Sequence, residues 1–308
     1  MTNNQSTSHI LMIRPVNFGF NEETAASNAF QKRNADKNSI KEKALQEFDG
    51  LVNILRENGV DVIVIEDTPE PYTPDSIFPN NWISFHADGT IFLYPMQAEN
   101  RRLERREDVV AQLEDSFEVK HIIDLSRFEL ENKFLEGTGS MVLDRENKIA
   151  FACVSPRTDR EVLALFCAQE GYKEVSFHAY DEYHQAIYHT NVLMCIGSKF
   201  AIICLDSISD DDEKNAVISI LKLTHKEIIS ISFEQMNRFA GNMLEVKNQA
   251  GETLIVMSQN ACDSLNQSQK DTLEKFGKLV YFDINTIENN GGGSARCMMA
   301  EVHLVHSS

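Results

Sequence analysis

The chain has 308 residues and a mass of 34.9 kDa; 42% of its residues are hydrophobic and 25% are charged. These proportions are typical of a globular protein that can bury a full core without disulfides or metal ions. Asp and Glu (47) outnumber Lys and Arg (29), and the resulting formal net charge of −18 argues against nucleic acid or an anionic membrane as a partner. No apolar run reaches the roughly 18 residues of a membrane span, and the first residues lack the features of a signal peptide. The six cysteines are irregularly spaced, which indicates reduced thiols and not a disulfide framework. Because thiols stay reduced in the cytosol, we expect a soluble cytoplasmic protein.

Five segments of the chain repeat apolar residues with the period of an amphipathic helix. The first and the third begin with apparent capping boxes, formed by Ser39 with Glu42 and by Thr158 with Glu161. The fourth begins with three consecutive aspartates, which the positive end of a helix dipole favours. The predicted helices cover residues 39–58, 101–115, 158–170, 209–223 and 268–276.

Short apolar segments between these helices are separated by turn residues, a pattern that indicates β-hairpins. The predicted hairpin strands are residues 82–86 with 91–94, 140–143 with 149–154, 191–196 with 200–205, and 243–246 with 254–257. One further strand follows each helix, at residues 60–65, 119–125, 173–178, 227–233 and 279–282. The last hairpin is divided between the two ends of the chain, with residues 297–305 as one arm and residues 10–14 as the other.

The hairpins recur at a regular interval. They begin near residues 81, 136, 190, 242 and 297, and the period of about 50 to 55 residues is typical of repeats in a ring or an array. Because the first strand completes the last hairpin, a closed ring is favoured over an open solenoid. We therefore expect an α/β fold of five hairpin–helix–strand modules around an axis, formed by a single domain over residues 1–308. The alternative is an ordinary mixed α/β sandwich with accidental regularity.

Equivalent modules would direct the residues that begin each hairpin toward a common centre. Polar side chains and glycines at these positions make a poor core but suit a reaction chamber. A cysteine near a histidine combines a nucleophile with an acid/base group, and a carboxylate can orient the group under attack. The residues at these positions are Asn80, Asn81, Glu136, His189, Asn191, Asn242 and Cys297.

Cys297 differs from the other cysteines because three glycines and Arg296 precede it. A neighbouring cation favours the thiolate form, which is the nucleophilic one. A structural role is expected for cysteines on apolar strands and helices. Four cysteines are of this kind: Cys153, Cys167, Cys195 and Cys204.

No metal or nucleotide site is evident in the sequence. His303 and His306 form an HxxH pair, but no third ligand accompanies them. Gly291–Gly293 are not followed by the Lys-Ser/Thr of a phosphate-binding loop. We therefore expect no metal and no cofactor.

Four motifs of this chain resemble those of the guanidine-modifying, or pentein, superfamily, which includes arginine deiminases, dimethylarginine hydrolases and amidinotransferases. The resemblance runs nearly end to end. It is strongest at Pro74–Phe78, Leu135–Gly137, His189–Asn191 and Gly291–Cys297. The superfamily has a five-bladed pseudosymmetric α/β propeller fold, which agrees with the number of modules counted above.

The resemblance also implies roles for individual residues. Cys297 is the expected nucleophile, His189 the general acid/base, and Glu136 a ligand of the substrate's planar head group. Asp75 is expected in the substrate pocket. Arg102 and Arg157 resemble arginines that clamp the α-carboxylate of an amino acid, for which the bidentate guanidinium is well suited.

Two amides depart from the pattern of the deiminases. Deiminases usually carry an acid where this chain has Asn81, and His-x-Asp where it has His189-Thr190-Asn191. A buried guanidinium requires carboxylates, whereas a neutral ureido group offers both a carbonyl and NH groups that an amide can match. With these two amides the resemblance narrows to the citrulline ureidases, which release ornithine; Asn242 is a further expected substrate-binding residue.

Other functions remain open at this stage. The runner-up is a hydrolase of arginine or methylarginine, followed by an amidinotransferase and a non-catalytic binding protein. The expected partner is a small amino-acid substrate, and the sequence leaves open whether the protein forms a homo-oligomer. The segment Phe18–Asn21 is a candidate lid.

Overall fold

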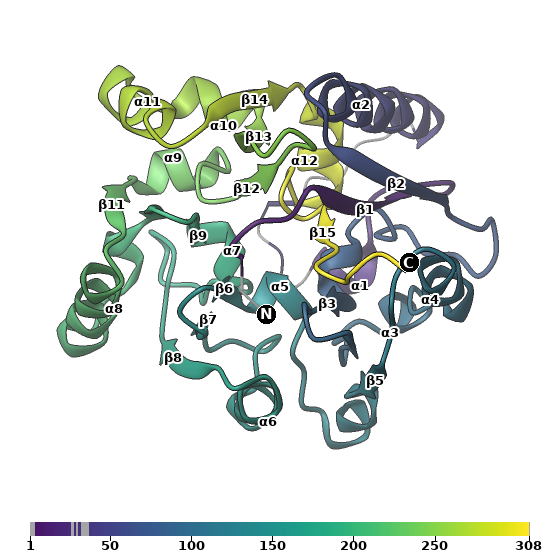
Figure 1. The fold of residues 1–308 in the computed structure, drawn as a ribbon, viewed down its shortest axis with the longest axis horizontal. Helices are drawn as coiled ribbons and strands as arrows, with labels where there is room; N and C mark the ends of the chain where they lie inside the picture. The colour runs from purple at the N-terminus through teal and green to yellow at the C-terminus, as the bar shows by residue number, and fades with distance from the viewer. Residues whose placement is uncertain (1–3, 26–27, 29, 32–36, 308) are drawn as a thin grey trace.

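The structure is a computed structural model that describes residues 4–25, 28, 30–31 and 37–307. It contains five three-stranded sheets arranged in a ring (Figure 1). In every sheet the central strand pairs antiparallel with one neighbour and parallel with the other. The predicted module, a hairpin followed by a helix and a parallel strand, is therefore confirmed five times.

The strands are short and lie close to their predicted positions. They are β1 (His9–Arg14), β2 (Asp61–Glu66) and β15 (Ala300–Glu301) in the first sheet; β3 (Ile83–Phe85), β4 (Thr90–Leu93) and β5 (His121–Asp124) in the second; β6 (Val142–Asp144), β7 (Ile149–Cys153) and β8 (Lys173–Phe177) in the third; β9 (Met194–Ile196), β10 (Phe200–Ile203) and β11 (Glu227–Ser230) in the fourth; and β12 (Leu244–Lys247), β13 (Thr253–Ser258) and β14 (Lys278–Phe282) in the fifth.

The first sheet closes the ring. Its central strand β1 comes from the N-terminus and pairs antiparallel with β15 near the C-terminus, with Ile10 opposite Glu301. On its other side β1 pairs in parallel with β2, with His9 beside Asp61. The two ends of the chain therefore meet in one sheet, as the divided hairpin predicted.

Five amphipathic helices connect each hairpin to its parallel strand and lie around the outside of the ring (Figure 1). Each packs its apolar face against the strands, as the buried Phe48, Leu51 and Leu55 of the first helix illustrate. These helices are α2 (Lys37–Glu57), α4 (Glu107–Glu114), α6 (Arg160–Glu170), α8 (Asp211–Leu223) and α11 (Gln267–Glu274).

Single helical turns precede three of the hairpins and lie toward the centre of the ring. They were not predicted, because three or four residues are too few to show a helical period, and residues 140 and 191–193 were wrongly assigned to strands. These turns are η1 (Pro79–Asn81), α5 (Gly137–Ser140) and α7 (Thr190–Leu193). The other short helices are α1 (Glu22–Ala25), α3 (Glu99–Arg102), η2 (Ser126–Glu131), η3 (Leu205–Ser207), α9 (Phe233–Asn237), α10 (Gln259–Ser264) and α12 (Asn285–Gly291).

Three details of the predicted helices were wrong. Helix α2 begins at Lys37, so Ser39 lies inside it and is not its cap. Asp159, not Thr158, caps α6, because its carboxylate accepts hydrogen bonds from the backbone NH groups of its first turn. The helix predicted over residues 101–115 is broken into α3 and α4, and this break lets Arg101 and Glu104 turn inward as a buried ion pair. Within the described residues, no helix has the length and apolar character needed to cross a membrane.

Candidate active site

A small cavity at the centre of the ring brings most of the predicted site residues together. Its volume is about 20 Å³, and it is walled by side chains from all parts of the chain. Its lining includes Asp75, Asn81, Arg157, His189 and Cys297. Three more predicted residues are buried and bonded to this lining: Glu136, Asn191 and Asn242.

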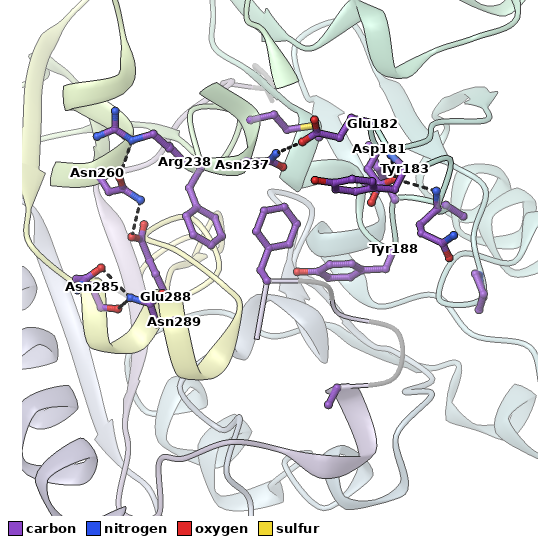
Figure 2. A pocket seen from close by; sticks show the side chains of 18 residues that line it. Asp181, Glu182, Tyr183, Tyr188, Asn237, Arg238, Asn260, Asn285, Glu288 and Asn289 are labelled. Atoms are coloured by element: carbon purple, nitrogen blue, oxygen red, sulfur yellow. Dashed lines mark hydrogen bonds between the residues drawn. The ribbon is translucent and has the colours of Figure 1, made fainter. Parts of the chain in front are cut away.

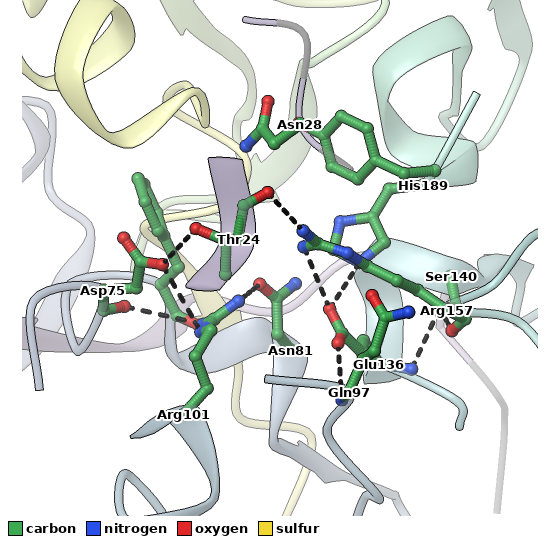
Figure 3. A network of polar contacts seen from close by, with 12 residues as sticks. Thr24, Asn28, Asp75, Asn81, Gln97, Arg101, Glu136, Ser140, Arg157 and His189 are labelled. Atoms are coloured by element: carbon green, nitrogen blue, oxygen red, sulfur yellow. Dashed lines mark hydrogen bonds and ion pairs between the residues drawn. The ribbon is translucent and has the colours of Figure 1, made fainter. Parts of the chain in front are cut away.

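Glu136 and His189 form the polar centre of the site (Figure 3). Glu136 Oε2 lies 2.8 Å from His189 Nε2 and 3.5 Å from the Arg157 guanidinium. Its other oxygen accepts a hydrogen bond from the Gln97 backbone NH at 3.0 Å. Glu136 lies in the Glu-Gly turn that begins α5, and His189 directly precedes α7, so two neighbouring modules build this pair.

These contacts determine the ionisation states of Glu136 and His189. Burial would raise the pKa of Glu136, but Arg157, His189 and Arg101 outweigh it and hold that pKa well below its usual range. Burial lowers the pKa of His189 to about 4, although Glu136 opposes the shift. At neutral pH the carboxylate can only accept a hydrogen bond, so His189 Nε2 carries the proton and donates a hydrogen bond to Glu136. The imidazole Nδ1 is therefore left with a lone pair.

Cys297 lies between two carboxamides. Asn191 Nδ2 is 3.4 Å from the sulfur and Asn242 Nδ2 is 3.3 Å from it. Asn242 also donates to the Asn191 carbonyl and accepts from the Arg296 backbone NH, which orients its amide. Two N–H donors aimed at one sulfur stabilise negative charge on it.

Arg296 does not act on the thiol as its sequence position suggested. Its guanidinium donates to Glu301 Oε2 at 2.6 Å and to the Met299 carbonyl at 2.9 Å. It is not among the residues that line the central cavity. The groups that contact the sulfur are the amides of Asn191 and Asn242 instead.

Glycine is required at two points near these side chains. A Cβ atom at Gly139 would lie 2.8 Å from His189 Nδ1 and 2.5 Å from Asn81 Nδ2, so only glycine lets the imidazole approach. Gly292 has a φ of +67°, a conformation that favours glycine, and it ends α12 just before the turn that carries Cys297.

The carboxylate clamp differs from the prediction at one arginine. Arg102 is not in the cavity: its guanidinium donates to the carbonyls of Met96 and Gln97 near the surface. Arg101 is buried instead and lines the cavity. The sequence motif contains both arginines, and both lie in α3, where adjacent side chains point about 100° apart and only Arg101 is buried.

Arg101 is held on both sides. It forms two hydrogen bonds of 2.9 Å with Glu104 and donates to Asn81 Oδ1 at 2.7 Å. Its nearest contact with Asp75 Oδ2 is 3.9 Å (Figure 3). Arg101 is therefore a fixed cation in the wall of the cavity.

Two buried oxygen atoms in this region have no hydrogen-bond partner among the described residues: Asp75 Oδ1 and Asn191 Oδ1. Unpaired buried acceptors are costly unless a ligand satisfies them. Asp75 lines the cavity itself, and Asn191 holds the nucleophile. Both oxygens are therefore candidates to accept hydrogen bonds from a substrate.

The N-terminal segment supplies residues that sequence analysis missed. Thr24 and Asn28 line the cavity. The Thr24 carbonyl accepts a hydrogen bond from Arg157 at 3.2 Å, and Asn21 Nδ2 donates to Asp75 Oδ2 at 2.7 Å. Asn21 is the last residue of the segment predicted as a lid, whereas Thr24 and Asn28 belong to no motif that could have marked them.

A second cavity of about 750 Å³ adjoins the first and shares Tyr188 with it. In Figure 2, Tyr183 and Tyr188 lie on one side of this cavity and Glu288 on the other. Tyr188 donates to the Gly292 carbonyl at 2.8 Å, and its ring lies 4.9 Å from the Arg157 guanidinium. The wall between the two cavities is thus tied to the turn that carries Cys297.

Comparisons with known proteins agree with this geometry. A family model described as N,N dimethylarginine dimethylhydrolase, eukaryotic, matches residues 14–304. No curated protein sequence matches the chain.

Among solved structures, the N-terminal domain of ArgZ is similar, with a TM-score of 0.75 and 19% identity over 96% of this chain and 97% of that one. ArgZ is described as an arginine dihydrolase from the ornithine–ammonia cycle in cyanobacteria. AgrE is similar with a TM-score of 0.76 and 17% identity, over 97% of this chain and 40% of that one.

A dimethylarginine hydrolase from Pseudomonas aeruginosa, solved with citrulline, has a TM-score of 0.66 and 13% identity over 96% of this chain and 99% of that one. At these identities the structures establish the five-bladed pentein fold, and the family match identifies the branch. The chain therefore belongs to the dimethylarginine dimethylhydrolase family of the pentein superfamily and is a hydrolase of non-peptide C–N bonds.

Proposed function

We propose that this protein hydrolyses the ureido C–N bond of citrulline to give ornithine, carbon dioxide and ammonia. This proposal rests on the side chains that surround Cys297. Among the described residues, the side chains that contact its sulfur by hydrogen bonds are the neutral amides of Asn191 and Asn242. A neutral ureido group needs both donors and acceptors, and a carboxamide supplies both.

The charges nearby support a neutral substrate group. Glu136 already faces the Arg157 guanidinium and accepts a hydrogen bond from His189, so its charge is partly compensated before any substrate binds. Asp75 accepts from Asn21 and lies 3.9 Å from Arg101. A guanidinium placed at Cys297 would lack an uncompensated carboxylate, and an unpaired buried charge typically costs about 3–5 kcal/mol.

The proposed reaction begins with attack of the Cys297 sulfur on the ureido carbon while His189 Nδ1 takes the thiol proton. The amides of Asn191 and Asn242 stabilise the developing negative charge. His189 then returns the proton to the departing δ-nitrogen, which releases ornithine and leaves an S-carbamoyl enzyme. Water, deprotonated by His189, attacks this thiocarbamate, the C–S bond breaks, and the Cys297 thiolate recovers the proton from His189 as carbamate leaves and decomposes to carbon dioxide and ammonia.

Charged residues in the wall of the cavity suit the amino-acid end of such a substrate. Arg101 and Arg157 present guanidinium groups that can pair with an α-carboxylate, and Asp75 Oδ1 can accept from an α-ammonium group. These charges are fixed by buried partners, so they orient the substrate without reorganisation. The role first given to Arg102 is reassigned to Arg101 in this proposal.

A second candidate function is hydrolysis of arginine or a methylated arginine. The match to the dimethylarginine family favours it, and Asp75 and Glu136 provide two carboxylates near the cavity. The two candidates share the nucleophile, the histidine and the fold. They differ in the charge of the substrate's head group.

Incubating the purified protein separately with citrulline, arginine and asymmetric dimethylarginine distinguishes the candidates. Ornithine, citrulline and ammonia are measured in each reaction. Ornithine from citrulline, lost in Cys297→Ala and retained in the matched variant Cys262→Ala, supports the proposal. Faster release of citrulline from arginine or dimethylarginine would overturn it in favour of the second candidate.

A further inference from the structure

Three potential metal ligands meet where the two ends of the chain close the ring. His9, Asp61 and His306 each offer one ligand atom, and these atoms lie within 4.8 Å of one another. His9 and Asp61 begin β1 and β2 and are partners in that parallel pair, with His9 Nδ1 2.8 Å from Asp61 Oδ2. The imidazole rings of His9 and His306 have centroids 4.6 Å apart.

The contacts of His306 orient its ring as a ligand. His306 Nδ1 lies 3.2 Å from the Ser116 carbonyl. A carbonyl can only accept, so Nδ1 carries the proton and Nε2 holds a free lone pair. Histidines that bind metals almost always donate their other ring N–H to a carboxylate, a backbone carbonyl or water, which fixes the tautomer in this way.

The backbone around His306 is also held in place. The Glu118 NH donates to the Val305 carbonyl at 2.8 Å, and the Ser307 NH donates to the Ser116 carbonyl at 2.9 Å. The chain after β15 therefore lies against the segment that follows α4, close to the C-terminus marked in Figure 1. His306 reaches His9 from a fixed backbone.

We propose that His9, Asp61 and His306 form a binding site for a divalent transition-metal ion, with zinc as the best match. Two imidazoles and one carboxylate are ligands that zinc accepts, and water can complete four-coordination. Tetrahedral ligands about 2.0–2.2 Å from zinc lie about 3.3–3.6 Å from each other, so the widest pair closes by about 1 Å. His306 is exposed and can make this movement.

A metal at this point would join β1, β2 and the segment after β15. These elements belong to the sheet built from both chain ends. The site is thus suited to fasten the ring, and this inference does not depend on the identity of the substrate. It also revises the expectation from the HxxH pair, because His303 points to Glu301 while His306 meets ligands from the N-terminal part of the chain.

Zinc chloride titration by calorimetry, with metal content measured after dialysis, tests the site. The titration uses Cys297→Ala protein, because the catalytic thiol and His189 would otherwise compete for zinc. We expect one zinc per chain and a rise of several degrees in the melting temperature. Adding His306→Ala or Asp61→Asn should raise the Kd for zinc at least tenfold.

The matched control adds His121→Ala, which removes an exposed histidine at the start of β5, and should leave the Kd unchanged. Circular dichroism confirms that each variant is folded. Either of two results would overturn the inference: no zinc bound by the Cys297→Ala protein, or an unchanged Kd after His306→Ala.

Discussion

The 2.8 Å contact between His189 Nε2 and Glu136 Oε2 determines which imidazole nitrogen can act on a substrate. Glu136 stays ionised because Arg157, His189 and Arg101 together outweigh the effect of its burial. The bond therefore holds His189 in the tautomer whose Nδ1 is free to accept a proton. Glu136 acts in this respect through His189, in addition to any contact with the head group.

Replacing Glu136 with Gln should lower kcat by about 10²–10⁴-fold, because an amide can bond either tautomer and no longer favours the reactive one. We expect a smaller change in KM, since the α-carboxylate and α-ammonium contacts remain. Steady-state kinetics measures both constants. Glu245→Gln, at a buried acid on β12 bonded to Ser198, is the matched control and should keep wild-type kcat. Equal losses in the two variants would contradict the role of Glu136.

The pH dependence of kcat/KM should report the lowered pKa of His189. Since that pKa is about 4, the base form persists at neutral pH and activity should fall only as the pH drops below about 5. In Glu136→Gln the acid limb should move to lower pH, because the carboxylate that raises this pKa is gone. An acid limb near pH 6.5 would mean that His189 is exposed or charged in the working enzyme.

The same shift makes a prediction about stability. The unfolded chain has an ordinary histidine pKa of about 6.5, so between about pH 6.5 and pH 4 it binds more protons at position 189 than the folded chain does. The contribution of His189 to stability is therefore present above that range and is lost as the pH falls through it, by up to about 3 kcal/mol. Urea unfolding of wild type and His189→Asn at several pH values should show wild type losing stability relative to the variant. A constant difference would contradict the buried neutral imidazole.

Asn191→Asp tests why the nucleophile is surrounded by amides. A carboxylate in contact with Cys297 can pair with a guanidinium but disfavours a neutral ureido group, so the ratio of arginine to citrulline turnover should rise at least tenfold. Asn81→Asp added to it should raise the ratio further. Asn58→Asp introduces an acid beside Lys278 outside the cavity lining and should leave the ratio unchanged. If Asn191→Asp also leaves it unchanged, the amides do not set the choice of substrate.

The fold could be predicted from the sequence because its signals are local. Apolar periods, turn residues and the recurring interval specify the modules, and the divided hairpin specifies closure between β1 and β15. Cys297, His189 and the other residues at the start of each hairpin followed from the equivalence of the modules. The sequence could specify where each of these residues lies within its module, but it could not specify which way each side chain points.

The remaining features depend on contacts between distant segments. Arg101 and Arg102 are adjacent in α3, and only the packing of this short helix against the rest of the site decides which one is buried. Thr24 reaches the site through the path of the N-terminal segment, which has no motif. His9 and His306 become neighbours only when the ring closes. None of these relationships has a period or spacing in the sequence.

Arg101 and Arg102 can be distinguished by paired variants. Removing Arg101 alone would leave Glu104 buried without its partner, at a cost of about 3–5 kcal/mol, so Arg101→Met is combined with Glu104→Gln. We expect this double variant to raise KM for the amino-acid substrate by about 10²-fold, because half of the carboxylate clamp is lost. Arg102→Ala, at a side chain bonded to backbone carbonyls near the surface, should leave KM within about twofold of wild type. The reverse order of effects would restore Arg102 as the substrate ligand.

Gly139→Ala tests the close packing behind the catalytic histidine. The new Cβ would lie 2.8 Å from His189 Nδ1 and 2.5 Å from Asn81 Nδ2, distances that real Cβ contacts do not reach, so the imidazole must move. Because misplacement by about 1 Å can cost about 10²-fold in rate, we expect kcat to fall by that order. Gly19→Ala is the control, since its Cβ would meet nothing closer than Tyr72 Oη at 3.9 Å. Circular dichroism should show both variants folded, and a wild-type kcat in folded Gly139→Ala would show that the imidazole has room the structure does not assign to it.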